Sequence, residues 1–203
     1  MQPGPTQPTV EILKRRRGYS GFFQIDIYQL RHRLYNGDMS PPLQRELFER
    51  GDAVALLPYD PQRDAVVLIE QFRIGALQAP QGPWLLEMVA GMIEPGETAP
   101  EVARREAQEE AGCQIGRIHS IGSFLVSPGG TSERIHLYCG EVDSATAEGV
   151  HGVAAEGEDI RVIVAPFSEA WRWLERGVID SASPIIALQW LQRERSRLQQ
   201  LWR

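Results

Sequence analysis

The chain has 203 residues and a formal net charge of −6 at pH 7, with 42% hydrophobic and 24% charged residues. These values are ordinary for a globular protein of one domain, or of one domain with a small appendage. An acidic chain without a dense Lys/Arg stripe is not expected to bind nucleic acid broadly. No apolar run reaches the ~20 residues that span a bilayer, so no membrane segment is expected. The start of the chain lacks a signal-peptide layout, which predicts a cytoplasmic protein.

Two regions are predicted before residue 51. Residues 1–8 contain three prolines and no periodic pattern, and we predict a disordered tail. Residues 9–50 alternate apolar and polar residues, which predicts two or three antiparallel strands with turns near Arg17-Gly18 and Asn36-Gly37. The basic run at 14–17 is predicted to lie on an exposed strand edge, where charge discourages edge pairing. Such a small sheet cannot bury both faces alone, so it should pack on the main domain or on a second subunit.

The remaining chain, residues 51–203, mixes strand and helix patterns and is predicted to be the main domain. Strands are predicted on both sides of a central helix, at residues 53–57, 65–73, 84–89, 117–126, 133–142 and 161–164. Residues 167–175 and 184–200 have the apolar spacing of helices. This order of elements predicts the α/β (α+β) class with a mixed sheet, plus a small N-terminal antiparallel sheet.

The stretch 91–113, GMIEPGETAPEVARREAQEEAGC, predicts a glycine-bounded loop followed by a helix. Thr98 and Glu101 fit the Thr-x-x-Glu capping box that starts helices. Gly112 fits the glycine that ends them. Glu106 and Glu110, within this helix, are one turn apart and therefore share one face.

A third carboxylate, Glu109, lies close beside Glu106 and Glu110. Like charges at this spacing destabilise a helix unless a cation lies between them. Arg105 can pair with Glu109, but we do not expect it to reach the face of Glu106 and Glu110. A hard divalent cation such as Mg²⁺ would fit there, shared with substrate phosphates. The alternative interpretation is a solvated acidic helix face, which is more common for an isolated Glu-rich helix.

The same stretch resembles the Nudix box, G-x5-E-x7-R-E-U-x-E-E-x-G-U, in which U is an apolar residue. The nine specified positions are filled by Gly91, Glu97, Arg105, Glu106, Ala107, Glu109, Glu110, Gly112 and Cys113. The resemblance implies the Nudix α/β/α sandwich and Mg²⁺-dependent hydrolysis of a nucleoside diphosphate linked to another group. It implies that Glu106 and Glu110 bind the metal. The residues that it implies to be structural are Gly91, Glu97, Arg105, Glu109 and Gly112.

Segments outside the box narrow the resemblance to the bacterial ADP-ribose pyrophosphatase subfamily. They are WLLEMVAGMIEPGE, which leads into the box, SFLVSPGGTSERIHLYCGEV after it, and EGEDIRV and IDSASPIIALQWLQ further on. The resemblance implies hydrolysis of ADP-ribose to AMP and ribose 5-phosphate. One alternative is a hydrolase of another nucleoside diphosphate sugar, such as GDP-mannose. An alternative of a different class is a catalytically silent ADP-ribose-binding sensor, against which the intact box argues.

The loop at residues 151–159, HGVAAEGED, is similar to the mobile loop that delivers the catalytic glutamate in this subfamily. The similarity implies that Glu156 is the catalytic base and that Glu158 binds a metal when the loop closes. The two roles can be exchanged. His151 is a weaker alternative base, since a lone loop histidine is usually only exposed.

The resemblance also implies a set of metal ligands and substrate contacts. Two to three Mg²⁺ ions, or Mn²⁺ ions, are implied in each active site, held by the carbonyl of Ala90 and by Glu106, Glu110 and Glu158. Arg73, at the end of a strand facing the box, is our candidate for a bidentate phosphate contact. The implied contacts to adenine are Arg45 and Phe22, the latter from a partner subunit, and those to the terminal ribose are Ser127 and Glu133. The implied assembly is a homodimer with exchanged N-terminal strands.

Overall fold

The computed structural model describes residues 9–202. The predicted tail, residues 1–8, lies outside the described residues, as does the side chain of Glu156. Residues up to Asp52, together with Leu125–Arg134, make one compact unit, and Ala53–Phe124 with the chain from Ile135 onward makes a second. No helix in the described part of the chain is both long and apolar enough to cross a membrane.

The first unit contains an antiparallel sheet of β1 (Val10–Ser20), β2 (Gln24–His32) and β3 (Leu43–Glu49). The predicted turn near residues 36–37 is confirmed, and Gly37 there has a φ of 97°. The predicted turn at Arg17-Gly18 is wrong, because β1 continues to Ser20 and the chain reverses before Gln24.

Gly18 has a different role from the predicted turn. A Cβ atom at this position would lie 2.8 Å from the side chain of Ile27, and the register between β1 and β2 shifts between Arg17 and Tyr19. The glycine therefore accommodates a bulge and a close side chain within the strand pair.

The basic run lies on β1, an exposed edge strand, as predicted. Two of its arginines face the carboxylate of Asp26, which is buried: Arg17 Nε lies 2.5 Å and Arg15 Nε 2.9 Å from Asp26 oxygens. The hydrogen bond from Arg15 is the main cause that lowers the pKa of Asp26. Part of this charge therefore stabilises the sheet itself instead of only protecting its edge.

The second unit is built on a mixed sheet with the strand order β10-β11-β5-β4-β9-β8, in which β6 also pairs with β5 and β7 with β4. The strands are β4 (Ala53–Asp60), β5 (Ala65–Phe72), β6 (Trp84–Glu87), β7 (Val89–Met92), β8 (Ile118–Leu125), β9 (Arg134–Glu141), β10 (Val150–His151) and β11 (Ile160–Pro166). β4 and β9 are parallel, whereas β4 and β5 are antiparallel. The predicted strand at 84–89 is two strands separated at Met88, and β10 was not predicted.

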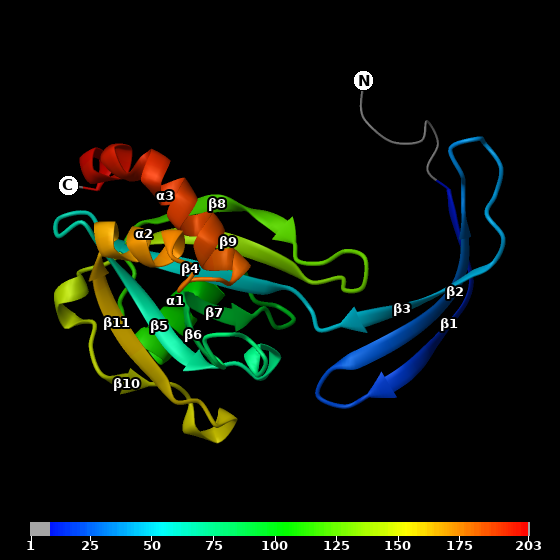
Figure 1. Cartoon of the computed structure of the whole chain (residues 1–203), viewed down its shortest axis with the longest axis horizontal. Helices are drawn as coiled ribbons and strands as arrows, with labels where there is room; N and C mark the ends of the chain where they lie inside the picture. Colours follow the sequence, from blue (N-terminus) through cyan, green and yellow to red (C-terminus); the bar gives the residue numbers. More distant parts are fainter. Residues whose placement is uncertain (1–8, 203) are drawn as a thin grey trace. The chain divides into compact units, whose positions relative to one another are not determined.

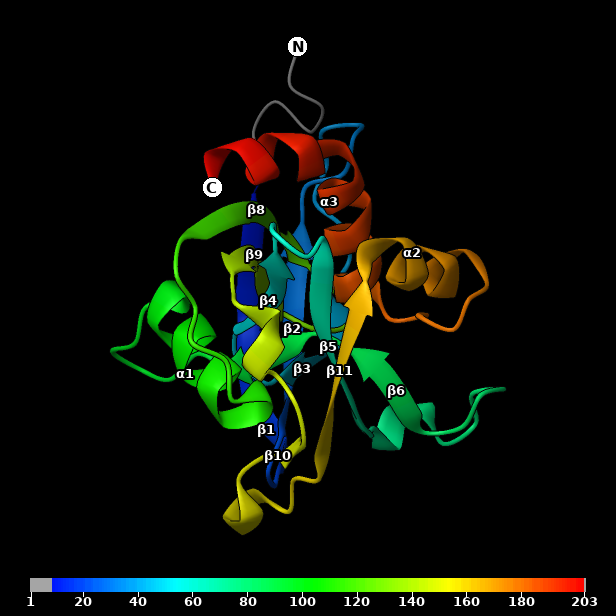
Figure 2. The ribbon, with the colours of Figure 1, turned by 90° about the vertical axis from the view of Figure 1, so that its left-hand side faces the viewer.

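Among the described residues, three α-helices cover the two faces of this sheet, and the predicted α/β class is confirmed (Figures 1 and 2). α1 (Ala99–Ala111) packs on one face, whereas α2 (Phe167–Glu175) and α3 (Ala182–Leu201) pack on the other. Short 3₁₀ helices cover Ile74–Ala76, Ser144–Thr146 and Ala154–Glu156. Both C-terminal helices match their predicted positions.

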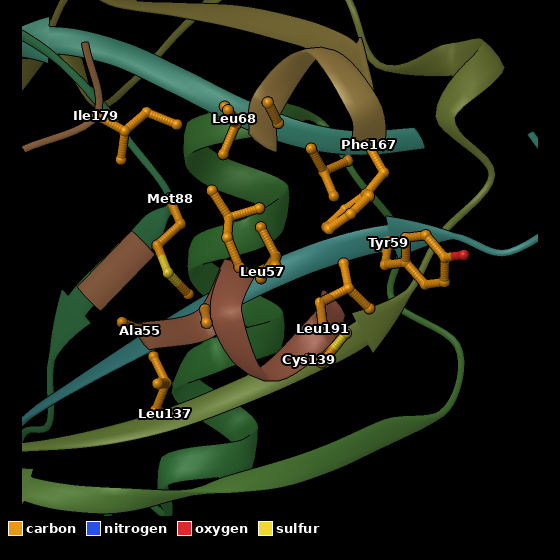
Figure 3. Close-up of a cluster of buried hydrophobic side chains, with 14 of the residues drawn as sticks. Ala55, Leu57, Tyr59, Leu68, Met88, Leu137, Cys139, Phe167, Ile179 and Leu191 are labelled. Carbon is orange, nitrogen blue, oxygen red and sulfur yellow. The ribbon is translucent and has the colours of Figure 1, made fainter. Parts of the chain in front are cut away.

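The core holds these layers together because β4 is buried along its whole length. Figure 3 shows the cluster under α2 and α3, where Leu57 and Leu68 from the sheet lie near Leu191 of α3. Each fully buried Leu side chain contributes about 1.5–3 kcal/mol by removal of apolar surface from water. Helix α1 lies over the opposite cluster, and this contact fixes the position of its carboxylates.

The turn that begins at Asp60-Pro61 joins β4 to β5 and is held by one buried carboxylate. Asp60 accepts hydrogen bonds from the amides of Gln62, Arg63 and Ser144, from the Ser144 hydroxyl and from the Arg63 guanidinium, at 2.7–3.0 Å. Burial alone would raise the pKa of Asp60, but these donors outweigh it and lower the pKa to about 2. The carboxylate thus joins the turn to a segment 84 residues later.

Candidate active site

Helix α1 begins and ends where its local sequence predicts. The backbone amide and the hydroxyl of Thr98 donate to Glu101, at 3.1 and 2.6 Å, within a capping box. Gly112 ends the helix in the left-handed conformation, with a φ of 62°. Between these ends, the apolar face of α1 packs on the sheet, and Glu106 and Glu110 contact β7.

Strand β7 leaves space for these carboxylates. Glu110 is only 2% exposed, and its Oε2 accepts a hydrogen bond of 2.9 Å from the amide of Ala90. A Cβ atom at Gly91 would lie 1.9 Å from Oε1 of Glu106, so only glycine fits there while Glu106 keeps this position. The Gly91 backbone and the Glu106 carboxylate are therefore in direct contact.

Both carboxyls hold protons more tightly than exposed glutamates do. Burial raises the pKa of Glu110 to about 8; the Ala90 amide lowers that pKa, while the charges of Glu106 and Glu158 raise it further. Burial also raises the pKa of Glu106 to about 7, although the nearby Arg105 opposes the effect. Buried like charges of this kind favour a bound cation or bound protons.

The donor set fits a metal that is shared with substrate. Within the described side chains, no three His, Cys, Asp or Glu residues meet closely enough to enclose a metal ion. Glu106 and Glu110 form a largely buried pair instead, and the carboxylate oxygens suit a hard divalent cation. Mg²⁺ commonly binds through one or two carboxylates and completes its shell with water and phosphate. The residues present therefore fit such an ion.

Arg105 contacts three carboxylates, one of them unexpectedly. Its guanidinium lies 3.3 Å from Glu97 and 2.9 Å from Glu109, as the predicted structural role requires. It also lies 2.9 Å from Oε1 of Glu106, so the prediction that Arg105 does not reach this face was wrong. A long arginine side chain can turn along the helix surface and compensate part of the charge on Glu106.

Arg73 extends from the end of β5 toward the same carboxylates. Its Nε lies 2.7 Å from Oε2 of Glu87 on β6, which holds the guanidinium in place. The charge of Arg73 also acts to lower the pKa of Glu110, although burial outweighs it. A guanidinium fixed beside a candidate metal site can contact a phosphate that the metal also binds.

The loop that carries Glu158 is attached to the end of α1. The amide of Gly152 donates to the carbonyl of Glu109 at 3.1 Å, and the amide of Val153 donates to Glu158 Oε2 at 2.9 Å. His151 points elsewhere, because its Nε2 lies 2.8 Å from the carbonyl of Glu148. Glu158 thus contributes negative charge to the site while remaining bonded within its own loop.

The other four substrate candidates from the sequence lie in the first unit. Phe22 is 88% exposed and packs edge-on against Phe23, while Arg45 donates to the Gln44 carbonyl at 2.8 Å. Glu133 is buried and lies 3.4 Å from Arg50. The carbonyl of Ser127 accepts from the Thr131 amide at 3.0 Å. Their roles stay predictions.

Sequence reasoning missed two polar residues beside Arg73. They are Glu87, which pairs with Arg73, and Gln71, which is buried in β5. One signal was available: both lie in strand segments that are mostly apolar, AVVLIEQF and WLLEMV, the first of which also contains Glu70. A polar residue inside a buried strand requires a partner.

Comparisons with known proteins show the family to which the chain belongs. A family model described as the NUDIX domain matches residues 49–188, and the chain belongs to this family and is a hydrolase. Hydrolases of this family generally use divalent metal ions, in agreement with the largely buried carboxylate pair. A solved structure described as "Crystal structure of ADP compounds hydrolase" has a TM-score of 0.69 at 21% identity, covering 95% of this chain and 98% of that one, which supports the fold.

Within this family, the chain is similar in sequence to two kinds of curated pyrophosphatase. The chain is 57% identical over 193 residues to ADP-ribose pyrophosphatase of Escherichia coli (strain K12), covering 95% of this chain and 92% of the relative. It is 47% identical over 201 residues to ADP-ribose pyrophosphatase of Haemophilus influenzae, covering 98% and 93%. Similarity to GDP-mannose pyrophosphatase of Cronobacter sakazakii is lower, at 38% over 151 residues, covering 73% and 78%.

Proposed function

We propose that this protein hydrolyses the pyrophosphate of ADP-ribose and releases AMP and ribose 5-phosphate in a Mg²⁺-dependent reaction. The observation that carries the proposal is the similarity to proteins named ADP-ribose pyrophosphatase, which extends over nearly the whole chain. The buried pair Glu106 and Glu110 supports it, because a pyrophosphate brings the negative charge that a divalent ion would neutralise beside them.

The metal ligands that we propose are Glu106, Glu110, Glu158 and the carbonyl of Ala90, for two to three ions. A bound Mg²⁺, or Mn²⁺ as the alternative, would lower the pKa of the attacking water and stabilise charge on the leaving phosphate. Deprotonated carboxylates are needed for this role, and the raised pKa values of Glu106 and Glu110 make protons competitors of the metal.

Two groups of the chain act directly on the substrate and the water in this proposal. Arg73 holds a phosphate through its planar guanidinium, which is oriented by its ion pair with Glu87. Glu156 takes the proton from the attacking water, and Glu158 is the alternative for this role. Closure of their loop would place the base within hydrogen-bond reach and exclude bulk water. A cytoplasmic location stays a prediction from the sequence.

A substrate panel with Mg²⁺ tests the proposed function. It compares ADP-ribose, GDP-mannose, other ADP- and UDP-sugars, NADH and diadenosine polyphosphates. We expect AMP release from ADP-ribose with a kcat/KM far above that for the rest. A preference for GDP-mannose would favour the first alternative, to which the similarity at 38% identity points. Binding of ADP-ribose without turnover of any substrate would identify a sensor.

The same assay distinguishes the two candidate bases. Glu156→Gln should lose mainly kcat if Glu156 is the base, and excess metal should not restore it. Glu158→Gln should recover partly with excess metal if Glu158 is a ligand. The reverse pattern would exchange the two roles.

We also propose a homodimer in which the N-terminal strands are exchanged, so that Phe22 contacts the partner's substrate. Mixing two impaired variants, Glu110→Gln and Phe22→Ala, tests this by subunit exchange. In the mixed dimer, one site would combine a native Glu110 with a native Phe22. Random pairing should then restore about a quarter of the native activity. No recovery, although native mass spectrometry shows mixed dimers, would mean that Phe22 acts within its own chain.

A further inference from the structure

The side chain of Gln71 is a buried hydrogen-bond donor without a partner. Gln71 lies near the end of β5 and is only 6% exposed. Its Nε2 atom is enclosed, and among the described residues it has no hydrogen-bond partner. Most buried polar groups in native proteins are paired, and leaving one unpaired destabilises the fold. Such a group therefore calls for a ligand, an ordered water or a functional reason.

The strand geometry places Gln71 on the face of the sheet that carries the active-site groups. Residues two apart on a strand share a face, so Gln71 shares one with Ile69 and Arg73. Ile69 packs in the cluster beneath α1. The backbone of Arg73 is still extended, with a φ of −128° and a ψ of 112°, so the alternation continues to this residue. Gln71 thus lies on this face of β5 between Ile69, in the core under α1, and Arg73 just beyond the strand end.

The neighbours on β6 do not satisfy this donor. Leu85 lies directly opposite Gln71 in the register and is apolar. Glu87 lies opposite Ile69, on the same face, but its Oε2 is 2.7 Å from Arg73. The free donor is thus a neutral amide, beside a cation that is already held in place.

We propose that Gln71 is a substrate-binding residue, whose Nε2 donates a hydrogen bond to a non-bridging oxygen of the substrate's pyrophosphate next to Arg73. The inference rests on the proposed function, and the ligand class is a nucleoside diphosphate sugar. A phosphate oxygen would be the hydrogen-bond acceptor that Gln71 Nε2 lacks among the described residues. The bond is charge-assisted because the oxygen is ionised. Non-bridging oxygens keep their charge from bound substrate to transition state. The contact should therefore strengthen binding more than it accelerates the chemical step.

Gln71→Met tests the inference because methionine has a similar length and volume but no donor. We expect the variant to unfold at the same temperature as the native protein or a higher one. Its affinity for a non-hydrolysable α,β-methylene analogue of ADP-ribose should fall about 10- to 100-fold, measured by calorimetry with Mg²⁺. With ADP-ribose itself, KM should rise by a similar factor, and kcat should change little.

Ser181→Ala is the matched control, because the Ser181 hydroxyl is also buried without a partner but lies at the start of α3. It removes an unpaired donor and should leave binding unchanged. Native-like binding by Gln71→Met would overturn the inference and point to an ordered water. A large fall in unfolding temperature together with weaker binding would also overturn it, since Gln71 would then be structural. If the native protein neither binds nor hydrolyses ADP-ribose, the proposed function fails first.

Discussion

Glu110→Gln is expected to stabilise the metal-free protein and to remove its activity. The native carboxyl is buried, and its charge is opposed by burial and by two other glutamates. Glutamine keeps an oxygen that can accept from the Ala90 amide at the same place, but it carries no charge. Relief of a buried, poorly compensated charge should add about 1–3 kcal/mol to the free energy of unfolding in EDTA. Each kcal/mol raises Tm by about 2–4 °C in a chain of this size.

The same substitution should abolish the response to metal. Mg²⁺ should raise the Tm of the native protein, because a ligand that binds only the folded state stabilises it. In Glu110→Gln this rise should largely disappear, and kcat/KM should fall about 10²- to 10³-fold. Glu194→Gln on α3 is the control, since Glu194 pairs with Arg197 on the surface. A variant that is less stable in EDTA but keeps its metal response would contradict the assignment of Glu110.

The pH dependence of the metal-free protein follows from the same pKa shift. The folded pKa of Glu110, about 8, lies above the ordinary glutamate pKa of 4.5. Between these values the folded state binds a proton that the unfolded state releases, so stability falls as pH rises. The loss from this group is complete above about pH 8 and amounts to about 5 kcal/mol at most. Thermal unfolding in EDTA should show a declining Tm across this range, with a flatter slope in Glu110→Gln.

The sequence predicts those helices and strands whose bounds are set by residues nearby in the chain. The capping box at Thr98 and the glycine at Gly112 define α1 to the residue. The buried run from Ala53 predicts β4 in the same way, although it continues to Asp60. In each case the signal and the structure that it specifies lie within a few residues of each other.

Features that depend on distant parts of the chain were not predictable in this way. Gly18 looked like a turn, but the residue that requires glycine there is Ile27 on the next strand. The burial of Asp60 depends on Ser144, and neither residue signals the other in the sequence. Gln71 is the clearest example. A glutamine near the end of a strand can lie on the surface, and only the packed sheet shows that its Nε2 donor is enclosed. The family resemblance identified the box residues but not these partners.

Gly91→Ala is expected to impair the site by moving Glu106. The added Cβ would lie 1.9 Å from Oε1, 2.1 Å from Cδ and 2.5 Å from Cγ of Glu106, too close for any non-bonded pair. Gly91 does not have a positive φ, so alanine fits the backbone and the whole effect comes from the side-chain clash. Overpacking of this kind costs about 1–3 kcal/mol. Displacement of one metal ligand should lower kcat/KM about 10²-fold, and the Tm rise with Mg²⁺ should shrink.

A double-mutant cycle separates this clash from a general defect. Glu106→Ala removes the atoms that a Cβ at Gly91 would meet, so it should restore the Tm of Gly91→Ala in EDTA without restoring activity. Gly75→Ala is the control, because nothing lies within 4 Å of a Cβ there and its φ is not positive. That variant should be neutral or slightly stabilised. If Gly91→Ala keeps native activity and metal response, Glu106 does not need its position against β7, and the pair on α1 would not be the metal site.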